Sequence, residues 1–95
     1  MNTMKTEITR SSSLCGGKAC LKGTRIRVMD LVERYKLLKE SPEEIALFYH
    51  LPMEAVFSAL SYYYEHVREI TAEISEDRKF ITKVRAQLRP VAYAT

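Results

Sequence analysis

The chain has little of what several common classes of protein require. Its 95 residues include no tryptophan, three glycines, three prolines and two cysteines. Cys15 and Cys20 have no second cysteine pair to complete a four-ligand zinc site, so we expect reduced thiols and neither a metal nor another cofactor. No run of about 18 apolar residues is present, which argues against a transmembrane helix. The N-terminal residues also lack the apolar segment of a secretory signal, and we therefore expect a cytoplasmic protein that does not bind membranes.

Residues arranged for catalysis are also lacking. No glycine-rich loop leads into a helix through a Lys-Ser/Thr pair, and Ser11–Ser13 have no base nearby in sequence. The carboxylates are spread over helical surfaces at spacings of three and four, among basic neighbours, as on solvated faces. We therefore expect no enzymatic activity. A small metal-dependent nuclease that uses these carboxylates is the alternative from the enzyme class.

Charge, by contrast, is strongly segregated behind the net value of +3. Residues 1–30 carry six basic and two acidic side chains, residues 31–76 carry four and nine, and residues 77–95 carry five and one. The basic first segment is suited to nucleic acid, and the basic last segment to nucleic acid or an acidic protein. A solvated helix face explains the last segment equally well.

Residues 15–28, which read CGGKACLKGTRIRV, are the most informative segment. Gly23-Thr24 predicts a tight turn between two short extended pieces, residues 19–21 and 25–28. The basic side chains of this ribbon suit phosphates and guanine edges. The predicted nucleic-acid contacts on the ribbon are Lys18, Lys22, Arg25 and Arg27. A purely structural hairpin with a solvated basic face is the alternative.

Three helices are predicted after the ribbon. The first covers residues 29–39, and its apolar face is Val28, Leu31, Val32, Tyr35 and Leu38. The second begins at Ser41, where Pro42 and Glu44 complete a capping box, and its face is Ile45, Phe48 and Tyr49. The third begins near Met53, and its face is Val56, Ala59, Leu60 and Tyr63.

The His50-Leu51-Pro52 break between the last two helices matches the spacing of a helix-turn-helix motif. The expected outward positions of the third helix are Met53, Glu54, Ser58, Ser61 and Tyr62. Of these, Ser58, Ser61 and Tyr62 are the candidates for nucleic-acid contact. None of the five is Arg, Lys, Asn or Gln, and Glu54 would repel phosphate. Electrostatic attraction to DNA would therefore come from the ribbon.

The last third of the chain shows a heptad-like apolar stripe. It comprises Leu60, Tyr63, Val67, Ile70 and Ile74, and then Ile81, Val84 and Leu88 after polar Asp77. One long helix or two stacked helices would produce this pattern. The stripe is long for so small a core, so we expect its lower part to pack on another chain, although packing on the domain's own core is the alternative. The predicted architecture is mainly α. Residues 1–76 are expected to form a winged-helix-like helix-turn-helix core with an N-terminal β-ribbon. Residues 77–95 are expected to form a C-terminal extension that is helical or folds on partner binding.

These segments resemble the family catalogued as domain of unknown function 433. The resemblance rests on residues 15–28, on Asp30-Leu31 and on the SPEEI run at residues 41–45. The third-helix positions Val56, Ala59-Leu60 and Tyr62-Tyr63 also follow the family's pattern. The resemblance extends over roughly residues 8–75.

The family is similar to the antitoxins of VapBC-type toxin–antitoxin pairs. The resemblance implies a homodimer that binds its own operator as double-stranded DNA and silences a PIN-like ribonuclease toxin. Since a C-terminal extension of an antitoxin generally holds the toxin, the implied partner-binding residues are Phe80, Ile81, Val84, Arg85, Leu88 and Arg89. An interaction module that uses the helix-turn-helix only as core, without binding DNA, is the alternative function.

Overall fold

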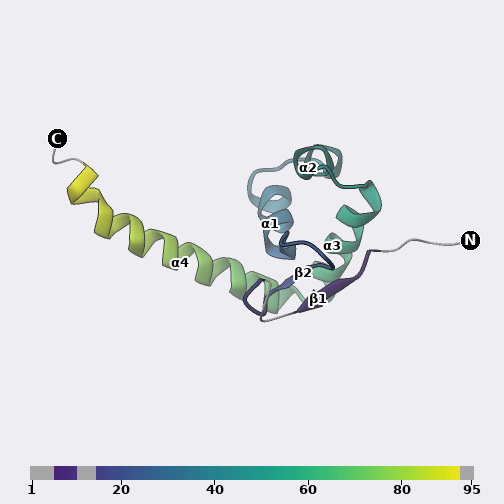
Figure 1. The fold of residues 1–95 in the computed structure, drawn as a ribbon, viewed down its shortest axis with the longest axis horizontal. Helices are drawn as coiled ribbons and strands as arrows, with labels where there is room; N and C mark the ends of the chain where they lie inside the picture. The colour runs from purple at the N-terminus through teal and green to yellow at the C-terminus, as the bar shows by residue number, and fades with distance from the viewer. Residues whose placement is uncertain (1–5, 11–14, 93–95) are drawn as a thin grey trace, which may run out of the picture.

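The computed structural model describes residues 6–10 and 15–92, with side chains through Gln87. Its elements are β1 (Ile8–Arg10), β2 (Ala19–Leu21), α1 (Val28–Val32), the π-helical turn η1 (Glu33–Leu37), α2 (Pro42–Tyr49), α3 (Met53–Glu65) and α4 (Val67–Ala92). The predicted class, mainly helical with a small antiparallel sheet near the N-terminus, is confirmed. Figure 1 shows a globular body of β1 to α3, from which α4 extends far to one side.

The small sheet differs from the predicted ribbon. The tight turn forms, with Gly23 at φ 79° and the amide of Thr24 donating to the carbonyl of Leu21 over 3.0 Å. However, β2 pairs with β1, in a register that sets Ile8 opposite Leu21. Residues 25–28 add only an isolated bridge between Cys20 and Arg27. The predicted second strand is absent because α1 already begins at Val28, one residue after that bridge.

The first predicted helix forms where the sequence places it, but only part of its predicted apolar face is buried. Val28, Leu31 and Val32 are buried as expected. In η1 the chain widens to a π turn, in which the amide of Leu38 donates to the carbonyl of Glu33, five residues earlier, over 3.2 Å. A π turn shifts the angular position of later residues relative to an α-helix. Leu38 consequently lies 61% exposed, so its predicted burial is wrong.

The second helix begins as its sequence predicts. The amide of Glu44 donates to Ser41 Oγ over 3.1 Å, and the amide of Ser41 donates to Glu44 Oε1 over 2.8 Å. The helix ends at His50, which takes the left-handed conformation at φ 58°. Ile45 is buried, but Phe48 is 56% exposed, contrary to the predicted apolar face.

The core lies between α1, α3 and the start of α4, under the sheet. The predicted inward face of α3 is buried, and His66 (φ −136°) separates α3 from α4, so the stripe belongs to two helices. Within residues 67–87 of α4, Ile70 alone is fully buried, while Ile74 packs partly against the core. The buried apolar residues are Ala19, Leu21, Val28, Met29, Leu31, Val32, Ile45, Ala46, Ala55, Val56, Ala59, Leu60, Tyr63 and Ile70.

The far half of α4, residues 78–92, is here called the arm. It runs away from the body, which makes the molecule 60 Å long and only 27 by 23 Å across. The predicted domain boundary between residues 76 and 77 falls inside α4, which continues through it as one helix. Among the described residues, no helix combines the length and apolar character needed to cross a membrane.

Candidate functional site

The basic ribbon is partly neutralised by the chain's own carboxylates. Lys22 forms an exposed ion pair with Glu7, with Nζ 3.1 Å from Oε1. Arg25 is exposed and Lys18 is partly buried, and within the described residues no carboxylate pairs with either. Of the four predicted nucleic-acid contacts on the ribbon, these two side chains are therefore the ones whose charge is left for an outside phosphate.

Arg27, the fourth, fastens the ribbon to the helices. Its Nε and Nη2 donate to the two oxygens of Asp30 over 3.0 and 2.8 Å, and Nη1 lies 3.8 Å from Asp77 of α4. The hydrogen bonds to Asp30, more than the opposing effect of burial, raise the pKa of Arg27 above its usual value. The Asp30 carboxylate also accepts the backbone amide of Arg27 over 3.2 Å. With its donors turned to carboxylates of its own chain, Arg27 is poorly placed for a phosphate.

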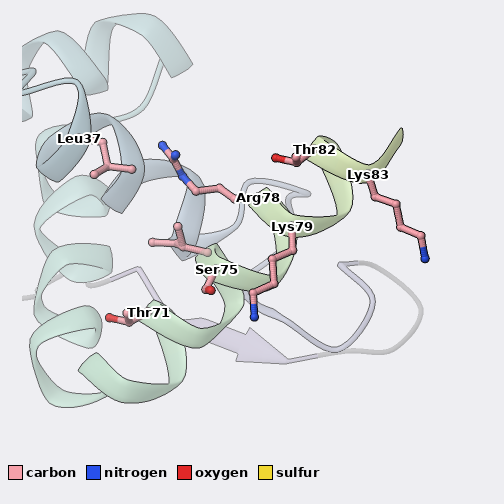
Figure 2. Close-up of a pocket in the computed structure, with 8 residues that line it drawn as sticks. Leu37, Thr71, Ser75, Arg78, Lys79, Thr82 and Lys83 are labelled. Atoms are coloured by element: carbon pink, nitrogen blue, oxygen red, sulfur yellow. The ribbon is translucent and has the colours of Figure 1, made fainter. Parts of the chain in front are cut away.

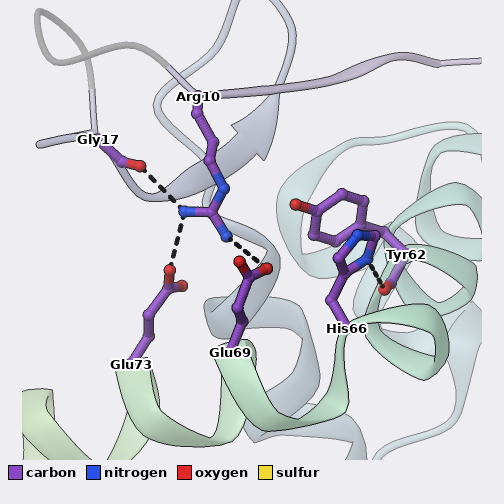
Figure 3. A network of polar contacts seen from close by, with 6 residues as sticks. All are labelled: Arg10, Gly17, Tyr62, His66, Glu69 and Glu73. Carbon is purple, nitrogen blue, oxygen red and sulfur yellow. Dashed lines mark hydrogen bonds and ion pairs between the residues drawn. The ribbon is translucent and has the colours of Figure 1, made fainter.

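Arg10 makes a second connection between the sheet and α4 (Figure 3). Its guanidinium donates to Glu69 over 3.2 Å, to Glu73 over 3.0 Å and to the carbonyl of Gly17 over 3.0 Å. Burial works against the charge, but the hydrogen bonds to Glu73 and the neighbouring Tyr62 outweigh it, and the pKa of Arg10 is raised. The sequence gives no signal for this network, because its two carboxylate acceptors lie 59 and 63 residues away.

The outer face of α3 is not the one predicted. Ser58 is only 8% exposed, so its predicted outward position is wrong. Tyr62 is partly buried and stacks on His66, with ring centroids 3.9 Å apart. Ser61 is exposed as expected, and its exposed neighbours are Phe57 and Tyr64.

At the N-terminal end of α3, the acidic side chain of Glu54 is already hydrogen-bonded within the chain. Both the backbone amide and the hydroxyl of Thr6 donate to the Glu54 carboxylate, the hydroxyl over 3.0 Å. The sequence predicts that Glu54 faces outward, but in the structure it is partly buried and contacts Thr6. Because α3 contains no Lys or Arg, its outer face has no side chain that attracts phosphate.

The arm carries the predicted partner-binding residues, and the side chains of four of them are described. Phe80 and Ile81 are 64% and 44% exposed, Arg85 is exposed and Val84 is partly buried. Ile81 and Val84 continue the helix face through which Ile70 and Ile74 reach the core, at spacings of three, four and seven. The side chains of Leu88 and Arg89 lie outside the described residues.

A groove of about 640 Å³ lies where the arm leaves the body (Figure 2). Leu37 of η1 faces α4 across it, and Ile74 adds a second apolar side chain. On the arm side the groove is bordered by Arg78, Lys79 and Lys83. Arg78 also lies 3.8 Å from Glu33, which ties the root of the arm to η1. The groove and the arm thus form a continuous apolar surface with basic edges.

The two thiols give no sign of a reactive or metal-binding centre. Cys20 is buried, and burial together with a hydrogen bond to Cys20 raises the pKa of Cys15 to about 11. A raised pKa lowers the thiolate fraction at neutral pH. Within residues 6–10 and 15–92, no three His, Cys, Asp or Glu side chains are grouped to hold a metal ion.

These features define a small helical domain with a two-stranded sheet and a projecting C-terminal helix. The chain belongs to the family described as protein of unknown function (DUF433), whose sequence profile matches residues 8–63. The match begins at β1 and ends at Tyr63, in the last turn of α3, so it does not include α4. No curated protein and no solved structure matches the chain.

Proposed function

We propose that this protein is the antitoxin of a VapBC-type pair, which neutralises a PIN-like ribonuclease toxin and represses its own operon as a homodimer. Family membership and the projecting arm support the proposal, and the arm is the observation that carries it. An amphipathic helix whose apolar face extends past its own core is suited to a partner's groove.

The chemistry of the arm fits a nuclease toxin. Its exposed Phe80 and Ile81 lie among Arg78, Lys79 and Lys83, with Arg85 one turn further on. A metal-dependent ribonuclease holds clustered carboxylates in its active site, and those carboxylates attract an arginine. Arg85 and Arg89 are the proposed residues that enter such a site, while the apolar stripe packs against the rim.

Inhibition of the toxin tests this proposal directly. The full chain is mixed with the toxin encoded beside it, and cleavage of a synthetic RNA is followed. Ile81→Glu combined with Arg85→Glu should weaken inhibition by about 30-fold or more, as for loss of a buried contact with its charge partner. Ala86→Glu, an exposed change on the opposite side of the arm, is the matched control and should inhibit normally. Equal inhibition by all three proteins would refute a toxin-binding arm.

Binding to the operator rests on the ribbon. Lys18 and Arg25 of two subunits could together neutralise several phosphates, each of which adds about −0.9 to the slope of log affinity against log salt. In a fluorescence-anisotropy titration, the duplex from the upstream region should bind roughly 10³-fold more tightly than a scrambled duplex. Arg25→Ala should weaken binding to both duplexes and make the salt slope shallower.

One observation favours a second candidate function, a protein-interaction module that does not bind DNA. The outer face of α3 is aromatic and acidic, with exposed Phe57 and Tyr64 and no basic side chain. A recognition helix normally presents Arg, Lys, Asn or Gln to base edges. Weak binding to both duplexes, equal for native and scrambled sequence, would favour this second function while leaving the toxin-binding arm intact.

A further inference from the structure

The outer face of α2 is apolar in its centre and acidic at its edges. Leu47 and Phe48 are 77% and 56% exposed, because α2 directs only Ile45 and Ala46 fully into the core. Glu43 and Glu44, both exposed, stand one turn earlier on the same outer face. These four residues, Glu43, Glu44, Leu47 and Phe48, are here called the acidic α2 face.

Two hollows flank Leu47 on this face. One, of about 290 Å³, lies among Glu40, Glu44, Leu47 and Phe48. The other, of about 390 Å³, is lined by Glu43, Ala46, Leu47, His50, Leu51 and Met53. Leu47 thus forms a ridge between two depressions. Glu40 is paired with Arg34, whose guanidinium lies 3.6 Å over the Phe48 ring, so the acidic edge of this face comes from Glu43 and Glu44. Such a surface fits a helix with apolar side chains on either side of the ridge and basic side chains around them.

The arm has this composition. Among the arm residues whose side chains are described, 78–87, the large exposed apolar ones are Phe80 and Ile81, and the basic residues around them are Arg78, Lys79, Lys83 and Arg85. The arm cannot reach the acidic α2 face of its own chain, because α4 runs away from the body on the side remote from α2 (Figure 1). The complementary surfaces of one molecule can therefore meet only between molecules.

We propose that the arm of one copy docks on the acidic α2 face of a second copy, and that the exchange is reciprocal. Reciprocal docking uses the same two surfaces twice and closes a two-fold dimer, the commonest symmetry of soluble oligomers. It covers Leu47, Phe48, Phe80 and Ile81 in both chains at once. The inference goes beyond the proposed function because it describes the chain without its toxin. In this state an acidic toxin would compete with the acidic α2 face for the arm.

The test is sedimentation velocity on the full chain and on two charge-reversed variants. One carries Glu43→Lys with Leu47→Lys, and the other carries Lys79→Glu with Lys83→Glu. All four changed side chains are exposed, so both variants should keep the far-UV circular dichroism of the parent. The parent should sediment as a dimer of the 11.0 kDa chain. Each variant alone should show a dimer dissociation constant raised on the order of 30-fold.

Mixing the two variants is the decisive step. In the mixture the reversed arm meets the reversed α2 face, and the two unchanged surfaces meet each other, so a heterodimer should return to nearly the parent affinity. Ala72→Lys, an exposed change on α4 outside both surfaces, is the control and should leave the dimer intact. A monomeric parent, dimers that survive both reversals, or no recovery on mixing would each overturn the proposal.

The α2 variant also separates this inference from the toxin-binding proposal. It retains every residue of the arm and should therefore inhibit the toxin at least as well as the parent. Normal inhibition by a monomeric α2 variant would support both proposals. If the exchange is correct but the arm does not bind the toxin, the variant becomes monomeric and neither it nor the parent inhibits the ribonuclease.

Discussion

Replacing Arg27 with alanine should destabilise the fold, although the sequence presents this arginine as one more basic residue of the ribbon. Its guanidinium makes two charge-assisted hydrogen bonds to Asp30, of 3.0 and 2.8 Å. Such bonds contribute about 1.5–3 kcal/mol each when fully buried. The two side chains are 29% and 22% exposed, so water screens the pair and the sum falls to about 1–2 kcal/mol.

The more distant Asp77, at 3.8 Å, adds at most a few tenths of a kcal/mol. For a domain of this length, a loss of 1–2 kcal/mol corresponds to a fall in Tm of about 5–15 °C. Urea denaturation followed by far-UV circular dichroism measures the free energy directly. Arg25→Ala is the matched control: Arg25 is exposed, and its replacement should change stability by less than about 0.5 kcal/mol.

Measurements of DNA binding should also distinguish the roles of Arg25 and Arg27. Arg25→Ala should weaken DNA binding in a protein of parental stability, whereas Arg27→Ala should lower stability and affect DNA only through the fold. A double-mutant cycle with Asp30→Ala should return a coupling energy of about 1 kcal/mol. An unchanged unfolding free energy for Arg27→Ala would show that the hydrogen bonds between Arg27 and Asp30 do not stabilise the fold.

Three further predictions concern single positions. Ile70→Ala should lower the free energy of unfolding by about 2–5 kcal/mol because Ile70 is fully buried, whereas Arg68→Ala, an exposed change on the same helix, should alter it by less than about 0.5 kcal/mol. Equal effects in urea denaturation would contradict the burial of Ile70 in the core. His50→Gly should raise the unfolding free energy by about 0.5–1 kcal/mol because φ at this position is 58°, and a lower Tm would contradict the left-handed cap. Because the pKa of Cys15 is raised to about 11, a smaller fraction of this thiol is ionised at pH 8 than of an ordinary cysteine, although each thiolate is more nucleophilic. Alkylation of Cys15 at pH 8 should therefore be about tenfold slower than that of an ordinary cysteine, and its rate should rise up to about pH 11. Peptide mass spectrometry distinguishes Cys15 from buried Cys20, and an alkylation rate that levels off near pH 9 would contradict the raised pKa.

Much of the local structure follows from short-range chemistry in the sequence. The Ser41–Glu44 capping box joins groups only three positions apart, and it forms as its residue types predict. The inward face of α3 follows from the helical period alone. The tight turn at Gly23 was likewise predictable, because its hydrogen bond spans three residues.

Tertiary structure decided which side chains of these elements are free to act. The π turn in η1 turned Leu38 to solvent, and the packing of α3 buried Ser58, although the pattern around each residue predicts the opposite. The roles of the arginines depended on partners that no local pattern identifies: Arg10 meets a carboxylate 63 residues away, and Arg27 reaches Asp77 on α4. Composition and periodicity thus determined a basic N-terminal segment, three helices and an amphipathic tail. Only the assembled fold decided which charges of this basic segment remain for a partner, because carboxylates of α1 and α4 approach it there. The energy of an ion pair depends on distance in space and not on separation in sequence.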